Sequence, residues 1–390
     1  MYKGKFVFAQ IFDFFNRYEF DKCVDRYQGD YKVRDFSCWC QFLCMAFGQI
    51  THRESINDII TCLNAQSKAA YHLGIKQVVS VSTLTRANEH RKWRIYADFA
   101  AYLLSITRPL YQDDSNFVLD LDNTVYAFDS TTIDLCLRTF VWAKFRKAKG
   151  AIKLHTLLDV RGCLPTFIYI TDGKVHDVNA LDELFFEEGA FYVMDKAYVD
   201  FARLYKITSS NSFFVVRAKD NLKFRCIKSC DVEKSKGLRC DQIIRLKTKK
   251  SAKDYPVYLR RIKYYDKEND LLLVFLTNNL EVSALTIALL YKQRWQVELF
   301  FKWIKQHLKI QVFWGYSANA VKTQVWIAIC SYLIVAYIKK QLNIDLTLYE
   351  MLQILSVSIF SKETISELFT NLSKNIKNNM SYNQLNLFNL

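Results

Sequence analysis

Proline and glycine are scarce in this sequence, with 3 and 10 copies among 390 residues. Their scarcity excludes a flexible linker, a collagen-like repeat and a low-complexity chain. Long hydrophobic runs are lacking too, because the longest, residues 325–338, is shorter than the roughly 20 residues that a membrane span needs. No small-residue cleavage site follows the apolar amino end, so we expect neither a membrane span nor a secretion signal. A chain of this length can instead bury a large core in two or three domains.

Acidic residues are fewer than basic ones. The chain has 39 Asp and Glu and 54 Lys and Arg, which gives a net charge of +15. This excess favours a polyanionic partner, and nucleic acid suits it better than a membrane surface. The 11 cysteines are odd in number, scattered, and lack paired CxxC spacing beside a histidine. We therefore expect reduced thiols in a cytoplasm, without a disulfide framework or a zinc site.

The first 115 residues read as a helical domain. Residues 36–50 are apolar at helical spacing, and residues 55–63 continue the pattern. Further on, Ser82 is expected to cap a basic helix that could read a DNA groove. The polar and basic side chains of that helix are Arg86, Asn88, His90, Arg91, Lys92 and Arg94. We take Arg86 and Arg91 as candidate DNA contacts; the alternative is an exposed basic helix packed on its neighbours.

Strands are predicted from residue 117 onward, at short segments rich in β-branched and aromatic residues. They cover residues 117–121, 125–128, 151–160, 165–171 and 191–194. A turn at residues 159–162 predicts a hairpin, and a helix is expected over residues 178–186. The strands 125–128 and 191–194 each end at an aspartate, Asp129 and Asp195. Two carboxylates at strand ends predict a mixed α/β sheet with a site along its edge.

A polar stripe runs along an otherwise apolar and aromatic helix expected over residues 289–310. Arg294, Glu298 and Lys305 follow Tyr291 at offsets of 3, 7 and 14. At about 100° per residue these offsets confine all four side chains to one stripe roughly 60° wide. Large apolar residues surround the stripe, so we expect it to face a cleft. The alternative is a solvated face with ordinary spaced charge pairs.

Three carboxylates, those of Asp129, Asp195 and Glu298, suit metal-dependent phosphodiester chemistry. Two divalent hard cations about 3.5–4 Å apart require several carboxylate oxygens, and they can activate a nucleophile and stabilise a leaving oxygen. Either aspartate alone could be a strand-end residue that starts a turn. Together with the helix stripe, the three acids predict a catalytic cluster.

Three motifs resemble the signature regions of DDE transposases of the insertion-sequence-four family. They are FDSTTIDL around Asp129, MDKAY around Asp195, and the Y-R-E-K pattern that contains Glu298. The Y-R-E-K pattern, Tyr-x2-Arg-x3-Glu-x6-Lys, is highly specific to that family, whereas the first two motifs are weak by themselves. The gaps of 66 and 103 residues between the three acids also fit the family.

The resemblance implies an RNase H-like catalytic domain with a β-rich insertion before the glutamate. It also implies that the three acids hold two Mg²⁺ (or Mn²⁺) ions, while Tyr291, Arg294 and Lys305 grip the transposon-end DNA. Some relatives stack a flipped base on a tryptophan of the insertion, and residues 219–280 contain none. Phe224, Tyr255 or Tyr258 are the candidates that could replace it.

The insertion carries most of the excess charge. Residues 219–263 hold 15 Lys and Arg against 5 Asp and Glu, a net charge of +10. Strands expected at residues 242–247, 255–263 and 271–277 would form a basic β-sheet suited to phosphate contacts, with Arg260 and Arg261 as candidates. The alternative is a solvated edge whose lysines prevent aggregation.

These observations predict a domain layout. A helical DNA-binding domain occupies residues 1–115. An RNase H-like catalytic domain has its first part at 116–218, a basic β-rich insertion at 219–280 and its second part at 281–345. A helical segment with a polar tail fills residues 346–390.

The expected function is that of a bacterial cut-and-paste DNA transposase that acts on the double-stranded ends of an insertion sequence and on target DNA. Cutting two ends together requires two active sites, so we expect a homodimer at paired ends, with apolar residues after residue 320 as its surface. A helix buried within its own domain is the alternative for those residues. The rival functions are a metal-dependent nuclease on the same scaffold and a non-catalytic, transposase-derived repressor.

Overall fold

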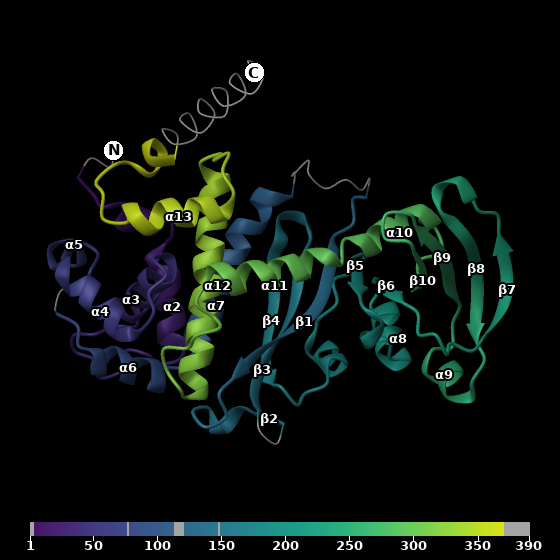
Figure 1. Ribbon diagram of the computed structural model, residues 1–390, viewed down its shortest axis with the longest axis horizontal. Coiled ribbons are helices and arrows are strands. Elements are labelled where there is room, and N and C mark those ends of the chain that lie inside the picture. Colours follow the sequence, from purple (N-terminus) through teal and green to yellow (C-terminus); the bar gives the residue numbers. More distant parts are fainter. Residues whose placement is uncertain (1–3, 76–77, 113–120, 147–148, 370–390) are drawn as a thin grey trace, which may run out of the picture. The chain divides into compact units, whose positions relative to one another are not determined.

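The computed structural model describes residues 4–75, 78–112, 121–146 and 149–369 (Figure 1). The chain forms two compact units. The helical unit joins Met1–Tyr111 to Trp303–Leu390, and the sheet unit is Gln112–Lys302. The boundary at residue 303 runs through the segment 281–345, which the sequence assigns to one part of the catalytic domain. The strand expected at residues 117–121 lies almost wholly outside the described residues.

The sheet unit is built on one mixed sheet, as the sequence predicts (Figure 1). Neighbouring strands follow the order β4 (Leu164–Asp172), β3 (Lys149–Asp159), β1 (Val125–Leu135), β5 (Phe191–Met194) and β6 (Phe213–Arg217). The first three pair antiparallel, whereas β5 and β6 run parallel to β1. A short strand, β2 (Lys144–Arg146), pairs antiparallel with the first residues of β3. This arrangement confirms the expected mixed α/β sheet.

Strand β5 and the first four residues of β1 are hydrophobic because both of their faces are covered. All four residues of β5 are buried, and so are the first four of β1. Buried parallel strands read as continuous apolar runs rather than alternating ones. Helix α8 (Phe201–Ser209) makes the crossover between β5 and β6, and its Leu204 and Ile207 enter the same core as Phe214. The predicted hairpin of β3 and β4 is confirmed, whereas the helix expected over 178–186 is a 3-10 segment, η4 (Asp177–Glu183).

The insertion extends the same sheet instead of forming a separate one. Strands β7 (Phe224–Cys230), β8 (Leu238–Leu246), β9 (Leu259–Asp266) and β10 (Leu271–Thr277) pair antiparallel in succession, and β10 pairs with β6. The strand predicted at 271–277 is confirmed residue for residue. The strand expected at 255–263 begins later, at Leu259, and follows a short helix, α9 (Lys249–Asp254), that Thr248 caps.

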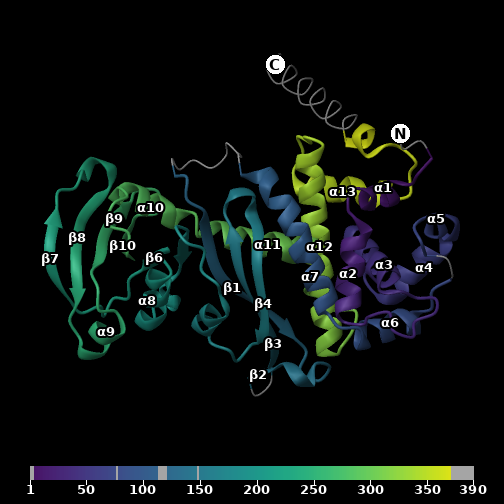
Figure 2. The same cartoon turned by 180° about the vertical axis from the view of Figure 1, so that it is seen from behind.

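Helix α12 (Ala318–Gln341) is the central element of the helical unit and packs against α7 (Arg94–Thr107) and α3 (Cys38–Ile50) (Figure 2). By length and composition α12 could cross a membrane, but 83% of its most apolar window is buried. Ile329 and Leu333 are each 1% exposed. The expected buried helix is confirmed, so these residues offer no surface to a second subunit.

The remaining helices of this unit are short. They are α1 (Val7–Asp13), α2 (Arg17–Arg26), α4 (Ile56–Ala65), α5 (Ser67–His72), α6 (Val81–His90) and α13 (Leu348–Ser358). The expected basic helix is split, because α6 ends at His90 and α7 begins at Arg94. Its cap is Ser80, whose hydroxyl accepts from the Thr83 amide, and not Ser82 as predicted.

Candidate active site

Asp129 and Asp195 leave neighbouring parallel strands at the same level. Phe128 pairs with Met194 in the last step of the parallel ladder between β1 and β5, and each aspartate is the next residue. The expected strand end at residue 128 is wrong, because β1 continues to Leu135 on its antiparallel pairing with β3. Only the parallel pairing stops there. The two carboxylates therefore lie where β1 and β5 diverge, at the carboxyl end of the parallel pair.

The stripe around Glu298 lies on two helices, not on one. Helix α10 (Ala284–Lys292) ends before Arg294, and α11 (Trp295–His307) starts after it. In the turn between them, backbone hydrogen bonds span three residues instead of four. The Gln293 amide donates to the Leu290 carbonyl at 3.0 Å, and the Arg294 amide donates to the Tyr291 carbonyl at 3.1 Å. No proline or glycine marks this break in the sequence.

The turn brings Arg294 and Tyr291 onto the three acids. One guanidinium nitrogen of Arg294, Nη1, lies 2.5 Å from Glu298 Oε1 and 3.3 Å from Asp129 Oδ2. The Tyr291 hydroxyl lies 3.5 Å from Asp195 Oδ1. Five of the residues singled out by sequence thus meet in one cluster within the sheet unit. Lys305 lies further along α11, in the part of that helix assigned to the helical unit.

Charge is unbalanced around Asp129. Burial raises the pKa of its carboxyl to about 6, although the Ser130 amide and the Arg294 guanidinium both act to lower it. The negative charges of Glu298 and Asp195 make smaller contributions to this upward shift. Burial, more than repulsion among the three carboxylates, therefore sets the pKa of Asp129.

The donor set fits a hard divalent cation. Carboxylate oxygens are the ligands that Mg²⁺ and Mn²⁺ prefer, and a cation beside Asp129 would favour the charged form that burial disfavours. Over the residues that the structure describes, however, no three His, Cys, Asp or Glu side chains are already arranged to hold a metal. The Arg294 guanidinium bridges two of the acids instead. The residues fit the ion in chemistry once that bridge opens.

A second polar cluster, missed by sequence reasoning, supports Asp129 from behind. The hydroxyl of Ser130 donates to Asp177 Oδ1 at 2.7 Å, and Lys153 Nζ reaches the same oxygen at 3.0 Å. His155 on β3 lies beside this pair, with Nδ1 3.9 Å from Asp177 Oδ1. Asp177 lies on η4 and Lys153 lies on β3, 24 residues apart, so no local sequence motif could predict this pair. The cluster fixes the residue that follows Asp129.

His155 makes this cluster sensitive to acid. Its side chain is fully buried, and burial lowers the pKa of His155 to about 4, with Asp177 opposing and Lys153 assisting that shift. Between pH 6.5 and 4 the unfolded chain binds a proton that the folded chain does not. Stability contributed by neutral His155 is therefore complete above pH 6.5 and is lost as the pH falls to 4.

We expect wild-type protein to lose about 2–3 kcal/mol more unfolding free energy than His155→Gln between pH 7 and pH 4. Glutamine keeps a polar group at the site but does not titrate. Hydrogen exchange of the β3 amides at both pH values measures the difference. Equal losses in the two proteins would show that His155 is not the group responsible.

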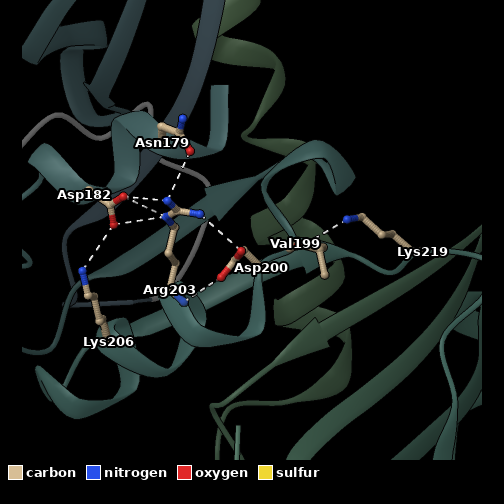
Figure 3. Close-up of polar contacts among 7 residues, drawn as sticks. All are labelled: Asn179, Asp182, Val199, Asp200, Arg203, Lys206 and Lys219. Atoms are coloured by element: carbon tan, nitrogen blue, oxygen red, sulfur yellow. Dashed lines mark hydrogen bonds and ion pairs between the residues drawn. The ribbon is translucent and has the colours of Figure 1, made fainter. Parts of the chain in front are cut away.

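The loop after Asp195 is held by charged side chains from three elements. Figure 3 shows the Arg203 guanidinium of α8 pointing at Asp182 of η4 and at Asp200, with contacts of 2.6 and 3.2 Å. Lys219 donates to the Val199 carbonyl at 2.9 Å. These contacts anchor the chain directly after Asp195 and so restrict where its carboxylate can lie.

Two of the sequence-predicted DNA contacts, Arg260 and Arg91, bind acceptors within the protein. Arg260 is 8% exposed, and its guanidinium pairs with buried Asp241 through two 2.8 Å contacts. Arg91 donates to the Phe36 carbonyl and to Gln41, which ties α6 to α3. These internal acceptors occupy donors of both guanidiniums, so Arg260 and Arg91 hold parts of the fold together, and their contact with DNA stays a prediction.

Other candidates remain on the surface. Arg86 is exposed on α6. Arg261 is half-buried beside the Phe224 ring and Gln242. Among the aromatic residues proposed to stack a base, Tyr255 is fully buried, whereas Tyr258 is 49% exposed.

Known proteins similar to this chain are transposases. Residues 120–334 match the family described as the transposase DDE domain, and residues 3–76 match a domain of unknown function. A Sinorhizobium fredii protein named as transposase y4zB is 31% identical over 242 residues, 61% of this chain and 67% of that protein. A Geobacillus stearothermophilus protein named as transposase for insertion sequence element IS5377 is 31% identical over 56% of this chain and 59% of its own length.

A solved piggyBac transposase synaptic complex with hairpin DNA has a TM-score of 0.45 and 10% identity, covering 98% of this chain and 85% of that chain. The family match spans more than half of the chain and includes all three acids together with the Tyr291–Arg294 turn. It agrees with the resemblance to the insertion-sequence-four transposases. The chain therefore belongs to the transposase DDE domain family.

Proposed function

We propose that this chain catalyses cut-and-paste transposition of an insertion sequence, by hydrolysis and strand transfer at the element's terminal inverted repeats. The observation that carries the proposal is the meeting of Asp129, Asp195 and Glu298 with Arg294 and Tyr291 at the end of the parallel strands. Acids from three distant positions supply oxygen ligands, and cationic and hydroxyl groups beside them suit a phosphodiester.

The residues of the cluster have separate tasks in this proposal. Asp129, Asp195 and Glu298 would hold two Mg²⁺ (or Mn²⁺) ions, which when bound activate the attacking oxygen and stabilise the leaving oxygen. The Ser130 amide donates to Asp129 Oδ1 and orients that carboxylate, while the Ser130 hydroxyl donates to Asp177 and holds Ser130 in place. Arg294 can pair with a phosphate through its planar fork of donors. Burial raises the pKa of Tyr291 to about 12, so its hydroxyl stays protonated and can donate to a phosphate oxygen.

DNA would extend from this cluster over the basic surfaces. We assign Lys305 on α11, Arg86 on α6 and Arg261 on β9 to duplex contacts, because long-range attraction of a +15 chain for phosphates needs many such groups. The helical residues before the sheet unit would bind the element's end, and the insertion strands would contact the cleaved end. Tyr258 is the exposed candidate for stacking an unpaired base.

A joining assay tests the proposal against its nearest rival. Purified protein, Mg²⁺ and a duplex that carries the element's terminal repeat are incubated with a supercoiled target plasmid. Transposition predicts that the cleaved end becomes covalently joined to the plasmid. A nuclease on the same scaffold would release ends without any joined product, and a repressor would bind without cutting.

We further propose a homodimer in the complex with paired ends, because two ends cut together need two clusters of acids. The net charge of +15 opposes association of the free chains until DNA neutralises it. Mass measurement with and without end DNA checks this expectation. A stable complex of one chain with two cleaved ends would rule out the dimer.

A further inference from the structure

One guanidinium nitrogen serves two acids in the cluster, and this arrangement has a consequence for metal uptake. Arg294 Nη1 contacts Glu298 Oε1 and Asp129 Oδ2 together. The side chain of Arg294 is 16% exposed, that of Glu298 33% and that of Asp129 21%. Solvent therefore screens these contacts only in part. The single positive charge stands between two carboxylates that the proposed function assigns to metal ions.

A guanidinium and a divalent cation compete for the same oxygens. Hydrogen bonds from Arg294 occupy lone pairs of both carboxylates and supply the positive charge that they need. A hard cation requires those lone pairs for itself and brings its own charge. Consistent with this competition, the described residues contain no trio of acids already arranged around a metal position.

We propose that Arg294 is the internal counter-cation of the acid cluster in the DNA-free protein, and that it must leave the acids before they take up divalent ions. Arg294 lies in the short turn between α10 and α11, so its side chain can rotate away without unwinding either helix. The inference rests on the proposed function, because it takes the acid cluster to be the metal site.

A DNA phosphate is the natural acceptor for the released guanidinium. Its oxygens match the planar fork of Arg294, and its approach would free both carboxylates at the same time. Phosphate binding and metal binding then favour each other, and by linkage the two effects are equal in size. The free protein would hold ions weakly and load them when an end occupies the site. This coupling would limit cleavage to DNA that is seated on the acids.

Mn²⁺ binding to the DNA-free protein tests the proposal without any activity measurement. Free Mn²⁺ is measured by electron paramagnetic resonance during titration of wild type, Arg294→Gln and Asp129→Asn. We expect Arg294→Gln to bind Mn²⁺ about tenfold more tightly than wild type, within the usual range of coupling between sites. Arg217→Gln is the matched control. Arg217 ends β6, and its charge reaches the Tyr291 hydroxyl.

Arg217→Gln should change the Mn²⁺ affinity little. This substitution removes a nearby positive charge but breaks no contact between a guanidinium and the acids. Equal gains in Arg217→Gln and Arg294→Gln would mean general electrostatics and would overturn the proposal. So would an Arg294→Gln protein that binds Mn²⁺ no better than wild type. Circular dichroism confirms that the variants fold.

A second arm uses wild-type protein only and so does not depend on any variant folding. Addition of a duplex that carries the element's terminal repeat should tighten the Mn²⁺ site about tenfold. Ions bound by the DNA itself are subtracted with the Asp129→Asn protein. No gain in this arm contradicts the coupling.

Asp129→Asn also separates failure of this inference from failure of the proposed function. If Asp129→Asn loses Mn²⁺ binding and Arg294→Gln gains no Mn²⁺ affinity, only the proposed role of Arg294 is wrong. Unchanged Mn²⁺ binding in Asp129→Asn, with or without DNA, means that the acids are not the metal site at all.

Discussion

Replacement of Asp129 by alanine should reduce strand cleavage on the order of a thousandfold or more, a loss of roughly 4 kcal/mol in transition-state stabilisation. Asp129 occupies the position where β1 leaves its parallel partner β5. The charges of Glu298 and Asp195 both act on its carboxylate. The loss of one carboxylate removes oxygen ligands that neither remaining acid can supply. Asp195→Ala and Glu298→Ala should behave in the same way.

DNA binding should survive in these variants, since affinity for phosphates comes mainly from Lys and Arg side chains. Cleavage of a labelled terminal-repeat duplex and a gel-shift titration measure the two properties separately. Arg86→Gln should give the opposite pattern: weaker binding with a shallower salt dependence, and cleavage restored at saturating protein.

Asp134→Ala is the matched control for Asp129→Ala. Both residues lie on β1, but their odd separation places them on opposite faces of the strand, and Asp134 is exposed. Cleavage by Asp134→Ala should therefore match wild type. Substantial cleavage by Asp129→Ala, or its loss in Asp134→Ala, would show that the wrong aspartate has been assigned.

Asp241→Ala should destabilise the insertion by about 3–5 kcal/mol, the usual cost of leaving a buried charge without its partner. The Asp241 carboxylate is 6% exposed and accepts from two nitrogens of Arg260, whose third nitrogen donates to the Val282 carbonyl at 2.5 Å. Without Asp241 the guanidinium would stay buried beside a single acceptor. Because the chain has more than one compact unit, hydrogen exchange of the β8 and β9 amides is a better measure than a single melting temperature.

Two comparisons sharpen this expectation. The double variant Asp241→Leu with Arg260→Met should recover most of the lost protection, since an apolar pair of similar volume leaves no buried charge. Glu233→Ala removes an acid from an exposed pair with Lys236 and should leave protection unchanged. Protection equal to wild type in Asp241→Ala would mean that the pair is dispensable.

Local patterning predicted much of the fold and the identity of the three acids. Strands β5 and β10 match the predicted segments residue for residue, because unbroken runs of large apolar side chains admit few other placements. The spacing of the charged residues after Tyr291 predicted one polar face. It did so even though two turn residues, Gln293 and Arg294, interrupt the helix.

Errors arose where partners lie far apart in the chain. Arg260 and Arg91 were taken as surface cations on charge alone, and both proved to be bound to acceptors on other elements. One error was local: the strand expected from residue 255 begins only at Leu259, after the six-residue helix that Thr248 caps. In each case a hydrogen bond formed by folding outweighed a local preference of about 1 kcal/mol or less.

The sequence alone determined the class of fold, the three carboxylates and the basic character of the chain, since hydrophobic period, strand-end acids and net charge depend only on residue order. The tertiary structure decided how those groups meet. The register of β1 against β5 puts Asp129 level with Asp195, and the α10–α11 turn places Arg294 between Asp129 and Glu298. Such contacts depend on distances between residues up to 165 positions apart, which local periodicity cannot encode.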